Sequence, residues 1–145
     1  MKYRSKRLAP VLKIAEKKEL YAAKVLADTR RSLKYYEDKL TQLKTFRDEY
    51  ANALRNGLLG TTSAAQLREY QHFLKQLNDG IDGLAEQVNK QKQVSRTDQA
   101  KWQHAKQHSG AIDRLIMKLH DIEQNIILTR EANEVDDRSQ RQTKS

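Results

Sequence analysis

The residue spacing in this sequence that most resembles a metal-binding site belongs to two histidines. His104 and His108 are four residues apart, so a helix would place both imidazoles on one face, as many metal sites require. The chain has no cysteine, and the next candidate ligands, Asp113 and His120, lie on later turns. We therefore expect no metal site and no cofactor, and we interpret these histidines as exposed side chains.

Catalytic motifs are also missing. The glycine pair in the segment GIDG, residues 80–83, is not part of a glycine-rich loop with the lysine that binds phosphate, and it lies within a helical pattern. The carboxylates are scattered and lack a concave, water-excluded pocket that could tune their acidity. We predict that the protein is not an enzyme.

The positions that decide the fold are mostly apolar and recur at a mean spacing of 3.5 residues; Glu19 and Arg47 interrupt the first stretch with charge, and the second stretch has fewer apolar residues in its middle. In the first stretch these positions are Leu8, Leu12, Ala15, Glu19, Ala22, Leu26, Thr29, Leu33, Tyr36, Leu40, Leu43, Arg47, Tyr50 and Leu54. In the second they are Leu67, Tyr70, Leu74, Leu77, Ile81, Leu84, Val88, Gln91, Ser95, Asp98, Trp102, Ala105, Ser109, Ile112, Ile116, Leu119, Glu123 and Ile126. A seam of this period is typical of helices that supercoil around a partner.

A cluster of turn-forming residues separates the two stretches: Gly57, Gly60, Thr61, Thr62 and Ser63. Ser63 or a neighbouring threonine is a candidate N-cap for the second helix. The sequence thus predicts an all-α fold, a long antiparallel two-helix coiled-coil hairpin with unequal arms that forms a single domain over residues 1–145. We expect helix one at about 8–56, the turn at about 57–63, helix two at about 64–136 and a frayed polar tail at 137–145.

The unequal arms leave apolar residues without a partner. With the turn centred near residue 60, Leu8 would face the region of Ile112. The apolar residues that would project beyond the first arm are Leu115, Ile116, Leu119, Ile122, Ile126, Ile127 and Leu128. An isolated helix with so much apolar surface is expected to bind a partner, to dimerise or to fold back.

Charge is concentrated at the start of the chain. The first 34 residues carry eleven Lys or Arg against three carboxylates, so +8 of the net +9 lies there. This basic end is either a solvated coiled-coil face or a surface that docks on an acidic protein, nucleic acid or anionic lipid. No apolar run approaches the ~18 residues that cross a bilayer, which favours the cytosol or a membrane surface.

Aromatic residues gather in the half of the hairpin near the turn. Tyr36, Tyr50 and Tyr70 occupy seam positions and are expected in the core. Phe46 and Phe73 lie one step off the seam, where a two-helix coil leaves side chains half exposed. Since exposed aromatic side chains often anchor interfaces, these two are our better interaction candidates.

Several segments resemble the FliJ family of bacterial flagellar export proteins. They are LKIAEKKELYAAKVL at 12–26, LTQLKTFRDEY at 40–50, LREYQHFLKQL at 67–77 and the tail EVDDRSQRQ at 134–142, together with the single Trp102. The resemblance covers nearly the whole chain, but the sequence differs from relatives at Lys39, Gly80 and Leu84.

The resemblance implies a nonenzymatic flagellar type III export component, located at the cytoplasmic face of the inner membrane. It would act as a stalk inserted through the hexameric flagellar export ATPase, linked to a membrane export gate protein and helping to handle export chaperones. Carried over by position, the gate-binding residues are Leu43, Phe46, Tyr50, Phe73 and Leu77. From the charge of the helix start and the apolar overhang of the second helix, we expect the ATPase-binding residues to be Lys6, Arg7, Lys13, Lys17, Leu119 and Ile126.

Other functions remain open. The equivalent stalk of a virulence type III secretion system would share the hairpin. A basic nucleic-acid-binding coiled coil is a second alternative, although the basic residues lack interleaved stacking aromatics, so we expect no nucleic-acid partner. A homodimeric scaffold is a third.

Overall fold

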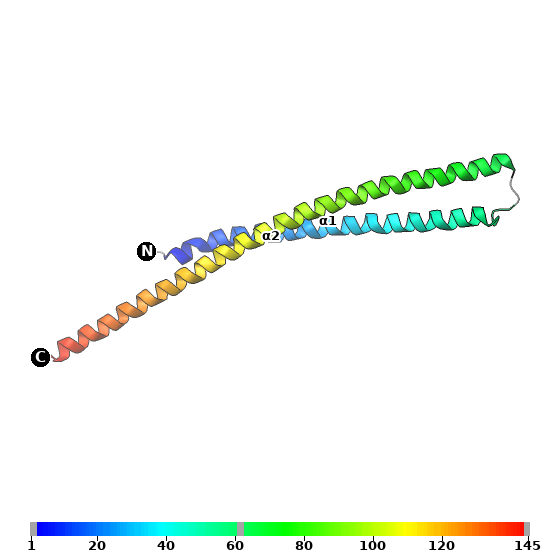
Figure 1. The fold of residues 1–145 in the computed structure, drawn as a ribbon. Coiled ribbons are helices and arrows are strands. Elements are labelled where there is room, and N and C mark those ends of the chain that lie inside the picture. The colour runs from blue at the N-terminus through cyan, green and yellow to red at the C-terminus, as the bar shows by residue number, and fades with distance from the viewer. Residues whose placement is uncertain (1–2, 61–62, 144–145) are drawn as a thin grey trace. The chain divides into compact units, whose positions relative to one another are not determined.

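Two long helices make up the fold of the protein. The computed structural model describes residues 3–60 and 63–143, and helix α1 (Arg4–Arg55, 52 residues) is followed by helix α2 (Ala64–Thr143, 80 residues) (Figure 1). The described residues contain no strand. The prediction of an all-α helical hairpin is confirmed.

Both outer helix boundaries differ from the prediction. Helix α1 begins at Arg4 rather than near residue 8, and so it includes Pro10, which cannot donate the usual backbone hydrogen bond. Helix α2 continues to Thr143, so the expectation that it ends near residue 136 was wrong. The final segment lacks Gly and Pro and carries Arg and Gln residues that favour helix, and this explains the extension.

The turn closes both helix ends with local hydrogen bonds. After α1, the Leu58 amide donates to the Ala53 carbonyl at 3.0 Å and the Gly57 amide donates to the Leu54 carbonyl at 3.4 Å. This pairing is a Schellman motif, which needs the left-handed backbone that Gly57 adopts at φ 65°. Gly60 has a positive φ as well, at 92°.

The predicted N-cap at Ser63 is confirmed. The Gln66 amide donates to the Ser63 hydroxyl, and the Gln66 side chain in turn accepts from the Ser63 amide, both at 3.2 Å. The two residues form a capping box that satisfies orphan donors at the start of α2. The candidate turn residues Thr61 and Thr62 lie outside the described residues.

The chain divides into two compact units, where the sequence suggested one domain. The terminal unit combines the described residues up to Ala22 with those from Lys101 onward. The turn unit comprises residues 23–100. Each unit is a pair of antiparallel segments, one from α1 and one from α2, and each is described by itself below.

The predicted seam forms the core of both units. In the turn unit Leu26, Leu77, Ile81 and Val88 are buried, and in the terminal unit Ala15 is buried at 3% exposure. The other seam positions are half-buried or buried, with two exceptions: Leu67 is 40% exposed and Ile126 is 46% exposed. The core is therefore one side-chain stripe wide.

Polar seam residues are paired across the two helices. In the terminal unit the Ser5 hydroxyl donates to Glu123 at 2.5 Å, and the Ser109 hydroxyl donates to Glu19 at 2.6 Å. In the turn unit the Thr29 hydroxyl lies 2.6 Å from Asp98. Each of these seam carboxylates thus accepts a hydrogen bond from a hydroxyl of the opposite helix, which offsets the cost of removing it from water.

These pairs correct the predicted register. Because Ser5 pairs with Glu123, Leu8 lies opposite a position near His120, not near Ile112. The difference is about one heptad, and a shift by one heptad still places seam against seam, so the apolar pattern does not distinguish the two registers.

The register also shortens the apolar overhang. Ile116, Leu119 and Ile127 are half-buried, whereas Leu115, Ile122, Ile126 and Leu128 are exposed. The prediction that these seven residues largely project beyond the first arm was wrong for Leu115, Ile116, Leu119 and Ile122, because the pairing of Ser5 with Glu123 places helix α1 alongside this part of α2.

Candidate partner-binding surfaces

Four aromatic side chains from both helices form a contiguous aromatic cluster in the turn unit: Phe46, Tyr50, Tyr70 and Phe73. The Tyr50 and Phe73 ring centroids are 5.0 Å apart with planes at 74°, and Phe46 meets Phe73 edge-on at 6.4 Å. Tyr50 also contacts Tyr70 at 6.4 Å and stacks with Phe46 at 6.5 Å. Such edge-to-face pairs hold the rings in fixed relative orientations.

The cluster has an exposed side and a buried side. Phe46 is 47% exposed and Phe73 is 39% exposed, whereas Tyr50 and Tyr70 are half-buried seam residues. Burial, followed by the nearby Tyr70, raises the pKa of the Tyr50 phenol above its ordinary value of 10.0. Tyr50 is therefore a neutral hydrogen-bonding group at physiological pH.

The five residues expected at the export gate differ in how much surface they offer. Phe46 and Phe73 are the exposed members, Leu43 and Tyr50 are half-buried, and Leu77 is buried at 9% exposure. Leu77 thus belongs to the core and offers little surface to a partner. A Cβ atom at Gly80 would lie 3.4 Å from the Leu43 side chain, so Gly80 is where the helices approach closely.

A shallow groove of about 380 Å³ extends the aromatic surface away from the turn. Its walls are Tyr35, Tyr36, Lys39, Gln42, Leu43, Phe46 and Leu84. The Lys39 ammonium lies 5.5 Å from the Tyr35 ring centroid in a cation–π contact. Sequence reasoning missed Tyr35 and Gln42 as surface candidates, although an off-seam tyrosine four residues before a lysine was a usable signal.

The terminal unit carries the basic residues expected at the ATPase. Lys6, Arg7, Lys13 and Lys17 are all exposed, and none of these four described residues forms an ion pair. Their charge is therefore available to an acidic partner.

The apolar candidates of the same unit lie on α2. Leu119 is half-buried against the helix pair, while Ile126 is exposed. A second groove, of about 330 Å³, is lined by Ile122, Asn125, Ile126, Thr129 and Arg130. Sequence analysis did not identify Asn125, Thr129 and Arg130, because these polar residues belong to no periodic pattern.

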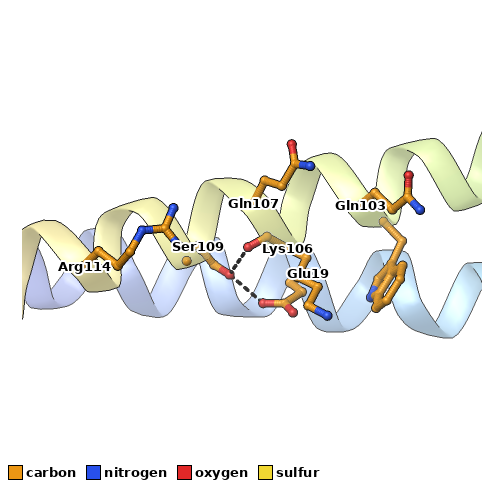
Figure 2. A pocket seen from close by; sticks show the side chains of 8 residues that line it. Glu19, Gln103, Lys106, Gln107, Ser109 and Arg114 are labelled. Carbon is orange, nitrogen blue, oxygen red and sulfur yellow. Dashed lines mark hydrogen bonds between the residues drawn. The ribbon is translucent and has the colours of Figure 1, made fainter.

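A third groove, of about 690 Å³, is polar and surrounds the seam pair of the terminal unit (Figure 2). The Lys106 ammonium lies 5.1 Å from the Trp102 ring centroid, and Arg114 lies at the other end of the groove. The Ser109 hydroxyl donates its single proton to Glu19 at 2.6 Å, and its oxygen lies 3.1 Å from the Lys106 carbonyl oxygen.

The serine and glutamate of this groove pair with each other across the two helices. Ser109 is 5% exposed, and it lies inside a continuous helix whose amides bond along the helix, so no oxyanion-binding pair of amides is present there. His104 and His108 are exposed on the same helix. Among residues 3–60 and 63–143, no group of three or more His, Cys, Asp or Glu could hold a metal ion.

The geometry defines the class of protein as a two-helix coiled coil whose surfaces are an aromatic cluster, a basic helix start and an apolar α2 segment. The family model described as "Flagellar FliJ protein" matches residues 4–145, and the chain belongs to this FliJ family. It is similar to the Flagellar FliJ protein of Escherichia coli strain K12, with 28% identity over 104 residues, covering 72% of this chain and 71% of the relative. No solved structure gives a significant match.

Membership of this family confirms the sequence-based resemblance and makes the protein a component of flagellar protein export, a noncatalytic role in that family. Within the described part of the chain, neither helix has a stretch long and apolar enough to span a bilayer.

Proposed function

We propose that the protein is the stalk of the flagellar export apparatus, binding the hexameric export ATPase through its terminal unit and the membrane export gate through its turn unit. One observation carries this proposal: two chemically different exposed surfaces lie in separate units joined by two uninterrupted helices. A protein with this arrangement can bind two partners without chemistry of its own.

The aromatic cluster and its groove are the surface proposed for the gate. Phe46 and Phe73 present exposed rings that are already packed against each other, so binding orders few additional side chains. Leu43 joins the cluster to the groove, and Tyr50 supplies a polar hydroxyl beside the rings. Exposed aromatic residues with a rigid base are typical interface anchors.

The terminal unit is the surface proposed for the ATPase. Lys6, Arg7, Lys13 and Lys17 offer positive charge along α1, and Ile126 offers an exposed apolar side chain on α2. Charge raises the rate of encounter with an acidic ring and apolar contact slows dissociation. Leu119, being half-buried, contributes mainly by supporting α2.

Coupling between the partners would be allosteric rather than catalytic. The stalk can bias the ring and the gate only if it makes different contacts in their different states. The protein would act in the cytoplasm at the inner face of the membrane, held there through its partners. We include assistance to export chaperones in the proposal, on the family resemblance alone.

The direct test measures ATP hydrolysis by the cognate export ATPase with and without the purified chain. The proposal expects stimulation, which Lys6→Glu/Lys13→Glu lowers and the matched change Lys90→Glu/Lys92→Glu leaves intact. Phe46→Ala/Phe73→Ala should retain stimulation but lose gate binding. Absence of ATPase binding at both low and moderate salt would remove the stalk proposal.

A swarming assay on a deletion strain separates this function from a virulence stalk. Loss of motility that the wild-type chain restores supports the flagellar role. Normal swarming would exclude it.

A further inference from the structure

A second surface of the terminal unit faces away from the seam along α1. At about 100° per residue, positions near the opposite side of the helix from Ala15 and Glu19 share one outer face. We define the outer face of α1 by Tyr3, Lys6, Pro10, Lys13, Ile14, Lys17, Leu20 and Tyr21. All eight residues are exposed, and none of them lines the three grooves described above.

The outer face exposes an unusual amount of apolar side chain. Leu20 is 73% exposed, Tyr21 is 71% exposed and Ile14 is 57% exposed. At about 100° per residue, Leu20 lies on one side of this face and Ile14 and Tyr21 lie on the other, with Lys17 between them. Several large exposed apolar side chains on one helix face mark a candidate interaction site.

Lys6, Lys13 and Lys17 lie along the middle of this face, between its exposed apolar side chains. Between Tyr3 and Tyr21 the only carboxylates are Glu16 and Glu19. Glu19 points to the seam, where it accepts the hydrogen bond from Ser109. Glu16 lies at the edge of the outer face, three residues after Lys13 and four before Leu20. Lys6, Lys13 and Lys17 form no ion pair within the described residues. The face therefore complements a negatively charged surface.

We propose that the outer face of α1 binds the surface of an anionic lipid bilayer, with the helix lying in the plane of the headgroups. A face that combines lysines with exposed Leu, Ile and Tyr offers both of the interactions that hold helices at an anionic bilayer surface, charge attraction and burial of apolar side chains. The lysine stems extend along the neighbouring apolar side chains while their ammonium groups reach the phosphates. Leu20 and Tyr21, the most exposed apolar members, insert among the upper acyl chains.

All three central basic residues of this face are lysines, whose charge sits at the end of a long, flexible side chain. An open line of flexible cations suits a fluid, planar anionic surface.

This inference goes beyond the stalk function, because it assigns the chain a membrane contact of its own. It shares Lys6, Lys13 and Lys17 with the proposed ATPase surface, so the two partners would compete for the same lysines. Leu20 and Tyr21 belong to the lipid proposal alone, and they make the two proposals separable.

The test is cosedimentation of the full chain with vesicles of phosphatidylcholine and of phosphatidylcholine mixed with phosphatidylglycerol. We expect binding to the mixed vesicles only, a loss of about fivefold for each of Lys13→Gln and Lys17→Gln, and near-complete loss for Leu20→Ser/Tyr21→Ser. The controls are Lys90→Gln/Lys92→Gln and Leu58→Ser/Tyr35→Ser, which change exposed side chains of the same types in the turn unit. Circular dichroism checks that every variant keeps its helices.

Equal binding to both vesicle types, or unchanged binding by Leu20→Ser/Tyr21→Ser, would overturn the lipid proposal. Duplex DNA binding as tight as vesicle binding and insensitive to Leu20→Ser/Tyr21→Ser would also overturn it, as it would make the face a nucleic-acid surface. Stimulation of the ATPase in lipid-free solution, measured on the same variants, reports on the stalk proposal separately.

Discussion

The Ser109 hydroxyl donates a hydrogen bond of 2.6 Å to a Glu19 carboxylate oxygen across the helix pair of the terminal unit. Both residues occupy seam positions, where most neighbours are apolar. The bond spans 90 residues of sequence and fixes one helix against the other. With Ser5–Glu123 in the same unit, it selects one alignment among those that the apolar stripe permits.

Removing the hydroxyl should destabilise the terminal unit. Ser109→Val leaves Glu19 half-buried without its partner, and we expect a loss of about 1–3 kcal/mol in unfolding free energy. Urea denaturation followed by circular dichroism measures this loss. Thr97→Val is the matched control, because Thr97 is exposed and bonds only within its own helix; equal effects of the two changes would contradict a special role for the seam pair.

The register itself can be tested by disulfide formation. The pairing of Ser5 with Glu123 and Glu19 with Ser109 places Leu12 opposite Ile116, so Leu12→Cys/Ile116→Cys should oxidise rapidly within one molecule. Leu8→Cys/Ile112→Cys, which only the alternative register would bring together, should oxidise slowly. Gel mobility with and without reductant gives both rates, and the reverse order would indicate the alternative register.

Substitutions in and beside the aromatic cluster should affect the stability of the protein and its binding to the gate differently. Leu77→Ala removes a buried side chain and should cost about 2 kcal/mol or more. Phe46→Ala truncates a ring that is 47% exposed, so its effect on thermal unfolding should be smaller, while binding to the gate protein should fall at least tenfold. Leu58→Ala, at a side chain 76% exposed in the turn, is the control for both measurements. Unchanged gate binding by Phe46→Ala would argue against the cluster as the anchor.

Tyr50 should make stability depend on alkaline pH. Burial raises the pKa of its phenol in the folded state, so the folded protein holds this proton at pH values where the unfolded chain has lost it. The resulting stabilisation is fully present below the ordinary pKa of 10.0 and is lost as pH rises through the raised folded pKa. Thermal unfolding across this range should show a fall that is smaller in Tyr50→Phe; Tyr35→Phe, an exposed tyrosine, should leave the fall unchanged.

Heptad spacing predicted the helices, the turn and nearly all the core, because a seam one stripe wide leaves a strong period in the sequence. It did not predict the alignment of α1 with α2, which depends on individual pairs such as Thr29 with Asp98. Glu19 and Glu123 interrupt the apolar seam in the sequence. In the structure each accepts a hydrogen bond from the opposite helix, and these bonds specify the alignment of α1 with α2. Local spacing carries no information on which distant hydroxyl will meet a carboxylate.

The candidate surfaces were predicted in part. Phe46 and Phe73 were found because their offset from the seam implies exposure, and the structure shows both exposed. Leu77 was carried over by resemblance and is buried, so its contribution to any interface is indirect. Tyr35 was missed, since a groove made by several turns of α1 with Leu84 of α2 cannot be read from one helix at a time.

No described side chain is completely enclosed. In a compact domain, loss of one core side chain lowers the stability of the whole domain. In this narrow two-helix core, each side chain packs only against residues within a turn or two, so the helices can separate stepwise from the chain ends. Hydrogen exchange should accordingly be graded along α1, fastest toward Arg4. The Schellman motif at Gly57 and the capping box at Ser63 hold the turn in place, so the two helices stay next to each other and can pair again after opening.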